Sequence, residues 1–123
     1  MGDISGKVNL KEAFGKFADH WRPRVVGRVN DFEVKVAKLE GEFVWHHHEE
    51  EDELFFVVKG RLRLLFKDRE EVRLDEGEFM VVPRGVEHLP IADEEVWVML
   101  FEPSGTRNTG NLTNERTVDP EDL

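Results

Sequence analysis

Short stretches rich in β-branched and aromatic residues, separated by glycine and aspartate turn signals, make up the middle of this chain. The pattern predicts strands at Phe32–Leu39, Phe43–His48, Leu54–Val58, Leu62–Phe66, Val72–Leu74, Phe79–Val82, Val86–Leu89 and Val96–Phe101. Turns are expected at Gly41, Gly60, Asp68, Gly77, Gly85 and Asp93. Eight such strands in succession indicate an all-β protein, built as a sandwich or a barrel.

A short helix is predicted ahead of these strands. Asn9 is suited to cap a helix. The apolar residues Leu10, Phe14 and Phe17 follow at spacings of four and three, which gives a helix one apolar face. We expect this face to pack on the barrel or on a partner subunit. Pro23 disfavours a helical residue before it, so the helix ends ahead of that point.

The composition changes after Pro103 to glycine, threonine, asparagine and charged residues, with few large apolar side chains. Such a segment cannot build its own core, so we expect an arm lying across the barrel or a partly disordered tail. The alternative is a lid or dimer arm, in which Arg107 and Arg116 bind an anionic group. Within a single domain, the predicted parts are a helix and lead-in (1–30), a barrel (31–102) and the C-terminal arm (103–123).

Length and composition limit the class of protein. A chain of 123 residues is long enough for one domain with a core and too short for two. No apolar run approaches the roughly 18 residues needed to cross a bilayer, and the first residues lack the apolar segment of a signal peptide. We therefore expect a cytoplasmic protein with no membrane partner. Because cysteine is absent, nitrogen and oxygen atoms must hold any metal.

The formal net charge of −10 is unevenly distributed. Residues 1–40 hold eight Lys and Arg against six acids, whereas the rest of the chain holds nine against twenty-one. Nucleic-acid-binding proteins usually present a basic stripe, and a negative field opposes docking on phosphate. We therefore expect no nucleic-acid partner. For most of these carboxylates, solubility is the simplest role.

The acidic part of the chain also contains most of the residues able to bind a metal. Side chains alternate across a strand, so His46 and His48 share one face of their predicted strand and His47 faces the other way. The polar run that follows suits a turn, after which Glu53 heads the next strand. His88 follows a stiff Pro-Arg-Gly turn. Three imidazoles and one carboxylate form the ligand set of a mixed nitrogen and oxygen metal centre.

Two motifs built on these residues resemble those of the cupin family. They are Gly41-x4-His46-x-His48-x4-Glu53-x6-Gly60 and Gly77-x5-Pro83-x-Gly85-x2-His88. Gly41 lies one residue closer to the first histidine than in the commonest family pattern, and Ala92 stands where many members carry Asn. The resemblance covers residues 31–102. The whole chain, including its closing segment, is similar to small stand-alone cupins described as mannose-6-phosphate-isomerase-like.

The resemblance implies a double-stranded β-helix, or cupin jelly-roll barrel, with a short N-terminal helix and an extended C-terminal arm. It also implies that His46, His48, Glu53 and His88 bind a divalent transition metal, which is Zn, Fe, Mn or Ni. Four protein ligands leave two positions of a six-coordinate ion for water, a small polar molecule or dioxygen. Because small cupins commonly dimerise, a homodimer is expected, with the helix and the arm available for exchange.

Several classes of function remain open at this point. An enzyme of sugar-isomerase or dioxygenase type needs a positioned acid or base, and the sequence shows no free carboxylate or histidine clearly placed on the inner face. A non-enzymatic module would bind or sense a small polar molecule without turnover. A purely structural partner protein would keep its metal content and every activity after loss of His88.

The other histidines and arginines have simpler interpretations. His47 is expected on the surface or in a second layer, and His20 at the end of the helix. Arg84 and Glu87, which flank the second motif's histidine, are either partners of that imidazole or exposed turn residues. The two arginines on the strand after Gly60 alternate with leucines, so we expect them on the outer face.

Overall fold

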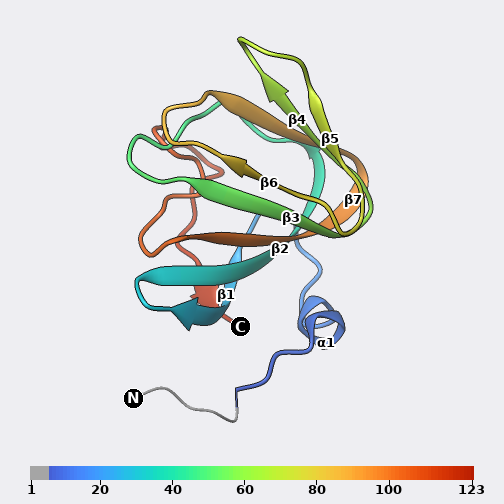
Figure 1. Cartoon of the computed structure of the whole chain (residues 1–123). Helices are drawn as coiled ribbons and strands as arrows, with labels where there is room; N and C mark the ends of the chain where they lie inside the picture. Colours follow the sequence, from blue (N-terminus) through green and yellow to red (C-terminus); the bar gives the residue numbers. More distant parts are fainter. Residues whose placement is uncertain (1–5) are drawn as a thin grey trace.

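The structure is a computed structural model that describes residues 6–123 (Figure 1). Within this range, one short helix precedes eight strands. The elements are α1 (Leu10–Phe14), β1 (Arg24–Val29), β2 (Phe32–Glu42), β3 (Glu53–Lys59), β4 (Leu62–Phe66), β5 (Val72–Leu74), β6 (Phe79–Val82), β7 (His88–Pro103) and β8 (Glu121–Asp122). The predicted all-β fold with a short N-terminal helix is confirmed.

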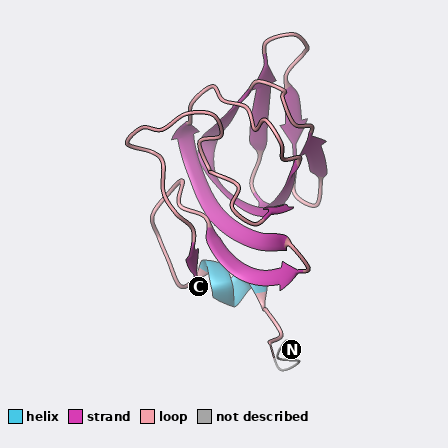
Figure 2. Ribbon diagram, turned by 90° about the vertical axis from the view of Figure 1, so that its left-hand side faces the viewer, coloured by secondary structure: helices cyan, strands magenta, loops and turns pink. Residues whose placement is uncertain are grey.

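Strand β7 organises the barrel because it pairs with three other strands along its length. Its first residues run antiparallel to β4, and its second half lies between β2 and β3. The remaining antiparallel pairs extend this arrangement, since β1 joins β2, β5 joins β4 and β6 joins β3. Figure 2 shows the strands curving around a common interior, with α1 outside it.

The interior is filled by side chains at alternate positions of the strands. In β3 and β4, every second residue is buried while the residues between are more exposed. The core includes Phe55, Val57, Leu64, Val98 and Leu100. Burying each large apolar side chain stabilises the fold by about 1.5–3 kcal/mol, so the barrel is held together mainly from inside.

Helix α1 is shorter than predicted. Asn9 accepts a hydrogen bond from a backbone amide of the first turn at 3.0 Å, which confirms the predicted cap. Phe14, the last helical residue, stacks on Trp97 with ring centroids 4.7 Å apart. Phe17 lies beyond the helix, where its carbonyl accepts a hydrogen bond from Lys38 at 2.8 Å. The helix thus ends at the point where Phe14 and Phe17 contact residues of the barrel.

With five residues, α1 is far too short to traverse a bilayer, and residues 6–123 hold no other helix.

The segment Phe43–His48 is not a strand, contrary to the prediction. Strand β2 continues past its predicted end to Glu42, and its register with β7 shifts near Gly41, whose φ is +87°. Gly41 therefore belongs to a bulge within the strand instead of a turn, in a conformation that glycine adopts without a steric penalty. Within Phe43–His48, only His46 takes part in a β-bridge, an isolated one with His88.

The predicted strands Val86–Leu89 and Val96–Phe101 are joined. Strand β7 runs without a break through Asp93, so the turn predicted there is wrong. The backbone on both sides of Asp93 pairs with β2, and its carboxylate binds Arg63 of β4 at 3.1 Å. These contacts keep a polar stretch in extended conformation, although its composition is typical of a turn.

Two further strands lie outside the predicted set. β1 falls in the predicted lead-in and pairs with β2 through a turn at Asn30, whose φ of +51° is one that asparagine tolerates. β8 runs parallel to β1, and the Leu123 amide donates to the Val25 carbonyl at 3.0 Å. The end of the chain is thus an arm lying on the barrel, the first of the two forms expected for it.

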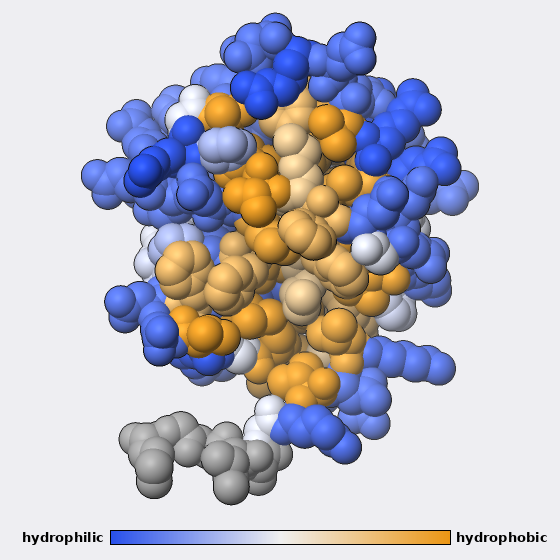
Figure 3. Space-filling model, in the orientation of Figure 1, coloured by the Kyte–Doolittle hydropathy of each residue, from blue (hydrophilic) through white to orange (hydrophobic). Residues whose placement is uncertain are grey.

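The outer side of the sheet formed by β6, β3, β7 and β2 carries a continuous group of apolar side chains (Figure 3). The members of this outer apolar face are Val34, Leu54, Phe56, Phe79, Val81, Met99 and Phe101. Phe79 is 60% exposed and Val81 is 45% exposed. A contiguous apolar patch of this kind often marks a contact surface.

Candidate metal centre

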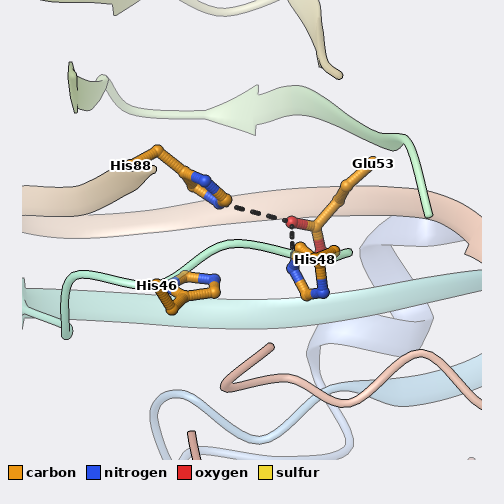
Figure 4. A group of neighbouring side chains, drawn as sticks. All are labelled: His46, His48, Glu53 and His88. Atoms are coloured by element: carbon orange, nitrogen blue, oxygen red, sulfur yellow. Dashed lines mark ion pairs between the residues drawn. The ribbon is translucent and has the colours of Figure 1, made fainter. Parts of the chain in front are cut away.

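Three parts of the chain converge on one buried point inside the barrel. His46 and His48 follow β2, Glu53 opens β3 and His88 opens β7. All four side chains are buried, and one nitrogen or oxygen atom of each lies within 4.8 Å of all the others. Figure 4 shows the three rings grouped around the Glu53 carboxylate. The structure therefore brings together the four residues that the sequence singled out.

Hydrogen bonds to the backbone orient two of the three rings. Nδ1 of His46 donates to the Val44 carbonyl and Nδ1 of His88 donates to the Val86 carbonyl, each at 2.9 Å. Because a carbonyl oxygen only accepts, Nδ1 carries the proton and Nε2 keeps a lone pair. Each ring therefore has its free nitrogen prepared to bind a cation.

Several buried polar atoms of the centre have no hydrogen-bond partner among the residues that the structure describes. They are both ring nitrogens of His48, Nε2 of His88 and Oε1 of Glu53. Oε1 of Glu53 lies 3.3 Å from Nε2 of His48 and 3.7 Å from Nε2 of His88. An unpaired buried polar atom costs about 1–3 kcal/mol, so the grouping of such atoms from three residues at one point indicates a ligand there. Neutral imidazoles and a carboxylate fit a divalent transition metal.

The surroundings keep two of the candidate ligands, His46 and Glu53, in the protonation states that metal binding requires. Burial, followed by the neighbouring His88 ring, lowers the pKa of His46 from 6.5 to about 4, so the ring is neutral at neutral pH. Burial raises the pKa of Glu53, but interactions with Glu102 and with the imidazoles of His48 and His88 outweigh it and hold that pKa well below its usual value. The carboxylate is therefore ionised.

The two remaining histidines lie outside the centre, as predicted. The His47 ring points away from it, with Nδ1 3.2 Å from Glu87 and Nε2 3.3 Å from Glu49. His20 pairs with Glu95 at 2.8 Å, but it lies well beyond Phe14 and so not at the end of the helix, where it was predicted. The run of three consecutive histidines therefore supplies two members of the centre.

The arginines singled out in the sequence are also placed away from the centre. Arg61 binds Asp75 at 2.7 Å and Arg63 binds Glu71 at 2.9 Å, which puts both in ion pairs on the outer surface. Two positions were considered for Arg84, as a partner of the His88 ring or as an exposed turn residue. It is exposed, which agrees with the second.

The C-terminal arm contacts the segment that carries the first two histidines. The Asn111 amide donates to the His47 carbonyl at 2.9 Å, and the His47 amide donates to Oδ1 of Asn111 at 3.0 Å. Gly110, at φ +59°, lies so close that a Cβ atom there would sit 2.2 Å from the His47 carbonyl oxygen and 3.0 Å from the His46 ring. The arm therefore holds this segment from outside the barrel, a role that the sequence did not reveal.

A cavity lies beside the centre. Its walls are mostly apolar and include Trp21, Leu39, Phe43, Phe55, Val98 and Leu100. Its polar lining consists of His46, Glu53, Glu102 and Asn108. Because two candidate ligands line this space, a molecule that enters it reaches the centre directly.

Glu102 in this lining is a carboxyl group that sequence reasoning missed. It is 1% exposed; its Oε1 accepts a hydrogen bond from Lys35 at 2.9 Å, while its Oε2 has no partner among residues 6–123. Burial and then the Glu53 charge raise its pKa well above the usual value, against the opposing effect of Lys35. The signal in the sequence is the two-residue spacing from Val98 and Leu100, which places a carboxyl group on a buried face.

Comparison with known proteins identifies the family. The family model described as cupin domain matches residues 32–106, which include all four residues of the centre. The chain belongs to the cupin family. This cupin is 44% identical to a cupin-2 domain protein from Shewanella frigidimarina NCIMB 400, with a TM-score of 0.79 over 83% of this chain and 99% of that one.

Two other relatives are similar to this cupin, one of them a solved structure. Protein NMB1881 from Neisseria meningitidis is 32% identical, with a TM-score of 0.73 over 80% of this cupin and 99% of that chain. The uncharacterized protein YdbB of Bacillus subtilis (strain 168) is 41% identical over 63 residues, which are 51% of this cupin and 56% of YdbB. The cupin thus matches about half the length of that curated relative. The predicted cupin barrel is confirmed.

Proposed function

We propose that this cupin binds one divalent transition metal ion, Zn, Fe, Mn or Ni, through His46, His48, Glu53 and His88, and uses it to act on a small molecule. The observation that carries the proposal is the convergence of buried, unpartnered ligand atoms at one point. Without a cation, this arrangement leaves several polar atoms unsatisfied in the interior. With one, the same atoms form a complete set of donors.

The residues of the centre have separate roles in this proposal. His46 and His88 are oriented by the carbonyl groups that accept from their Nδ1 atoms. Glu53 supplies the negative charge that a divalent cation requires in a buried site. When bound, the metal would supply Lewis-acid activation or, if it is Fe or Mn, dioxygen chemistry.

Two kinds of activity follow from such a centre, and the fold does not choose between them. One is a dioxygenase or a sugar-type isomerase, in line with the predicted mannose-6-phosphate-isomerase-like subgroup. A hydroquinone 1,2-dioxygenase in complex with Cd²⁺ shares the fold at 17% identity and a TM-score of 0.66. The second kind of activity is binding or sensing of a small molecule without turnover. The buried Glu102 carboxyl group beside the centre favours the first, because polar groups at such a position commonly contact a reacting molecule.

Elemental analysis of the purified cupin tests the metal proposal. We expect about one equivalent of a transition metal in the unmodified protein and less than about a tenth of an equivalent in His88→Ala. The reason is that the affinity for the metal depends on the complete set of four ligands. His47→Ala is the matched control: it changes the same type of residue in the same region but should keep the metal. A metal content below about a tenth in the unmodified protein would overturn the assignment.

The homodimer and the cytoplasmic location expected from the sequence stay predictions and form part of this proposal. In the structure, α1 and the arm both pack on their own barrel.

A further inference from the structure

We propose that a surface pocket between the segment before β1 and the C-terminal arm binds a small oxyanion of the phosphate type, held by the guanidinium groups of Arg22 and Arg116. None of the residues that line this pocket belongs to the metal centre. The inference therefore stands apart from the proposed function.

Two segments far apart in the chain line the pocket, which has a volume of about 170 Å³. The lining residues are His20, Trp21, Arg22, Glu115, Arg116 and Val118. By the same measure a cavity needs only about 10–15 Å³ to hold one water molecule, so a group of several heavy atoms fits here.

Arg116 is fixed in place but has no acidic partner among residues 6–123. Its carbonyl accepts a hydrogen bond from the Asn108 side chain, and its amide donates to the Asn114 side chain, each at 2.8 Å. Its guanidinium lies over the rings of Trp21 and Phe43, at 5.8 and 5.6 Å from their centroids. A guanidinium held over aromatic rings keeps N–H donors available for an oxyanion.

A half-buried guanidinium without an acidic partner is unexpected in this chain, because acids outnumber basic residues by 27 to 17. Arg61 and Arg63, for comparison, pair with carboxylates at 2.7 and 2.9 Å. Arg107, the other arginine of the arm, donates to the Thr113 hydroxyl at 2.8 Å and does not line this pocket. Of the two arginines that the sequence indicated for an anionic group, Arg116 is therefore the one placed in this pocket.

Arg22 brings a second guanidinium from the other side of the pocket. It is exposed, and its contact with Asp19 is long, at 3.9 Å. Asp19 already accepts hydrogen bonds from both terminal nitrogens of Arg24, so it leaves Arg22 largely unpaired. A phosphate group accepts paired hydrogen bonds from guanidinium groups, and two of them can share its oxygens.

The charges of the remaining lining residues do not cancel those of the two arginines. Glu115 is the one carboxylate in the lining. His20 is already paired with Glu95 at 2.8 Å. Two guanidinium groups therefore face one carboxylate, and the pocket attracts an anion although the chain as a whole is acidic.

Trp21 supports the pocket through an unusual backbone conformation. Its φ is +63°, which is costly for a bulky residue. Its amide donates to the Lys38 carbonyl and its indole N–H to the Glu40 carbonyl, each at 2.9 Å. Strain of this kind persists only where the surroundings enforce it, and it is common at sites that hold a ligand. Here it sets the ring beneath the Arg116 guanidinium.

NMR titration of the full-length cupin with inorganic phosphate, at constant ionic strength, tests the inference. We expect the signals of the Arg116 amide and the Trp21 indole to shift together and to saturate, with a dissociation constant of about 1 mM or tighter. Arg116→Gln should weaken phosphate binding by at least about tenfold, because the charge and the fork of donors are lost. Arg107→Gln is the matched control, since it makes the same change in the same arm and should bind phosphate normally.

Arg22→Gln guards against failure of Arg116→Gln to fold, because the Arg22 side chain is exposed. It should weaken phosphate binding by about threefold or more. The inference would be overturned by shifts that do not saturate, by shifts confined to the metal centre, or by binding unchanged in whichever of these two variants folds. An equal loss of binding in Arg107→Gln would overturn it as well.

Discussion

A carbonyl oxygen two residues back decides which nitrogen of His46 faces the centre, and the same contact recurs at His88. In both cases the ring is held by the backbone of its own segment, so its orientation does not depend on the metal. The centre is therefore largely preorganised by local geometry. This reduces the conformational cost of metal binding, since two of the three rings are already fixed.

Gly110 provides a test of the contact between the arm and the metal-binding segment. Gly110→Ala should lower zinc affinity by about tenfold or more, because its Cβ atom would displace the backbone next to His46. Gly77→Ala is the control, since Gly77 also has a positive φ but a Cβ atom there would meet no other atom within 4 Å. Backbone strain should destabilise the fold by about 1 kcal/mol in Gly77→Ala, and Gly110→Ala should cost more, because its Cβ atom also meets the His47 carbonyl oxygen. Competition titration with a chelator measures the difference, and equal zinc affinities would contradict this role of the arm.

The residues of the centre were predictable because they stand in the two motifs that resemble those of the cupin family. Strand alternation also set His47 apart, although its premise was wrong, since Phe43–His48 is not a strand. His46, His48 and Glu53 lie within one short stretch, and only His88 is brought from far along the chain. Glu102 was missed for a physical reason. Glu102 stands out because Lys35 donates a hydrogen bond to only one of its two carboxyl oxygens. That contact joins two strands far apart in the chain, so the spacing of residues in the sequence does not predict it.

At the scale of elements, the apolar runs predicted the strands well. The polar residues gave a wrong prediction where pairing with neighbouring strands overrode their preference for a turn. Strands β4, β5 and β6 have the predicted bounds. The turn signal at Asp93 failed because neighbouring strands hold that backbone extended. Phe43–His48 has strand composition, yet after the bulge at Gly41 it keeps only a backbone hydrogen bond from Phe43 to Pro90 and an isolated bridge between His46 and His88 as contacts with β7. Local propensity is weaker than tertiary pairing at such positions.

Truncation tests the arm as an element. Removal of residues 104–123 should reduce zinc affinity by about tenfold, because Asn111 then no longer holds the His47 backbone. Removal of residues 119–123 alone takes away β8 but keeps that contact, so zinc affinity should be unchanged. Circular dichroism checks that both proteins fold. If the longer truncation does not, Asn111→Leu removes the side-chain half of the contact, the bond from the His47 amide to Oδ1, and unchanged zinc affinity in it would contradict a role for that bond.

At the scale of the whole molecule, strong acidity and a localised apolar surface occur together. The net charge of −10 keeps copies of the chain apart in general, whereas the outer apolar face presents no charged member. Two copies can therefore approach most favourably through this face, where burial of apolar area offsets the repulsion. This is where we place the contact of the homodimer expected from the sequence.

Substitution on this face tests the homodimer. Phe79→Ser combined with Val81→Ser should shift the cupin toward monomer, with the dissociation constant raised by about tenfold or more, since two exposed apolar side chains are lost from each copy. Lys67→Ser, an exposed position on another side of the barrel, should leave it unchanged. Sedimentation equilibrium measures both. A monomeric unmodified protein at high concentration would refute the homodimer.

The reciprocal backbone pair between His46 and His88 has a consequence for the order of folding. His46 donates to the His88 carbonyl at 3.1 Å and His88 donates back at 2.9 Å, so the two histidines meet only when β7 has docked against the segment after β2. These contacts join distant parts of the chain, and such contacts are entropically costly to form early. We therefore expect the complete donor set to form late, so that an ion bound as we propose would bind only after the barrel has closed.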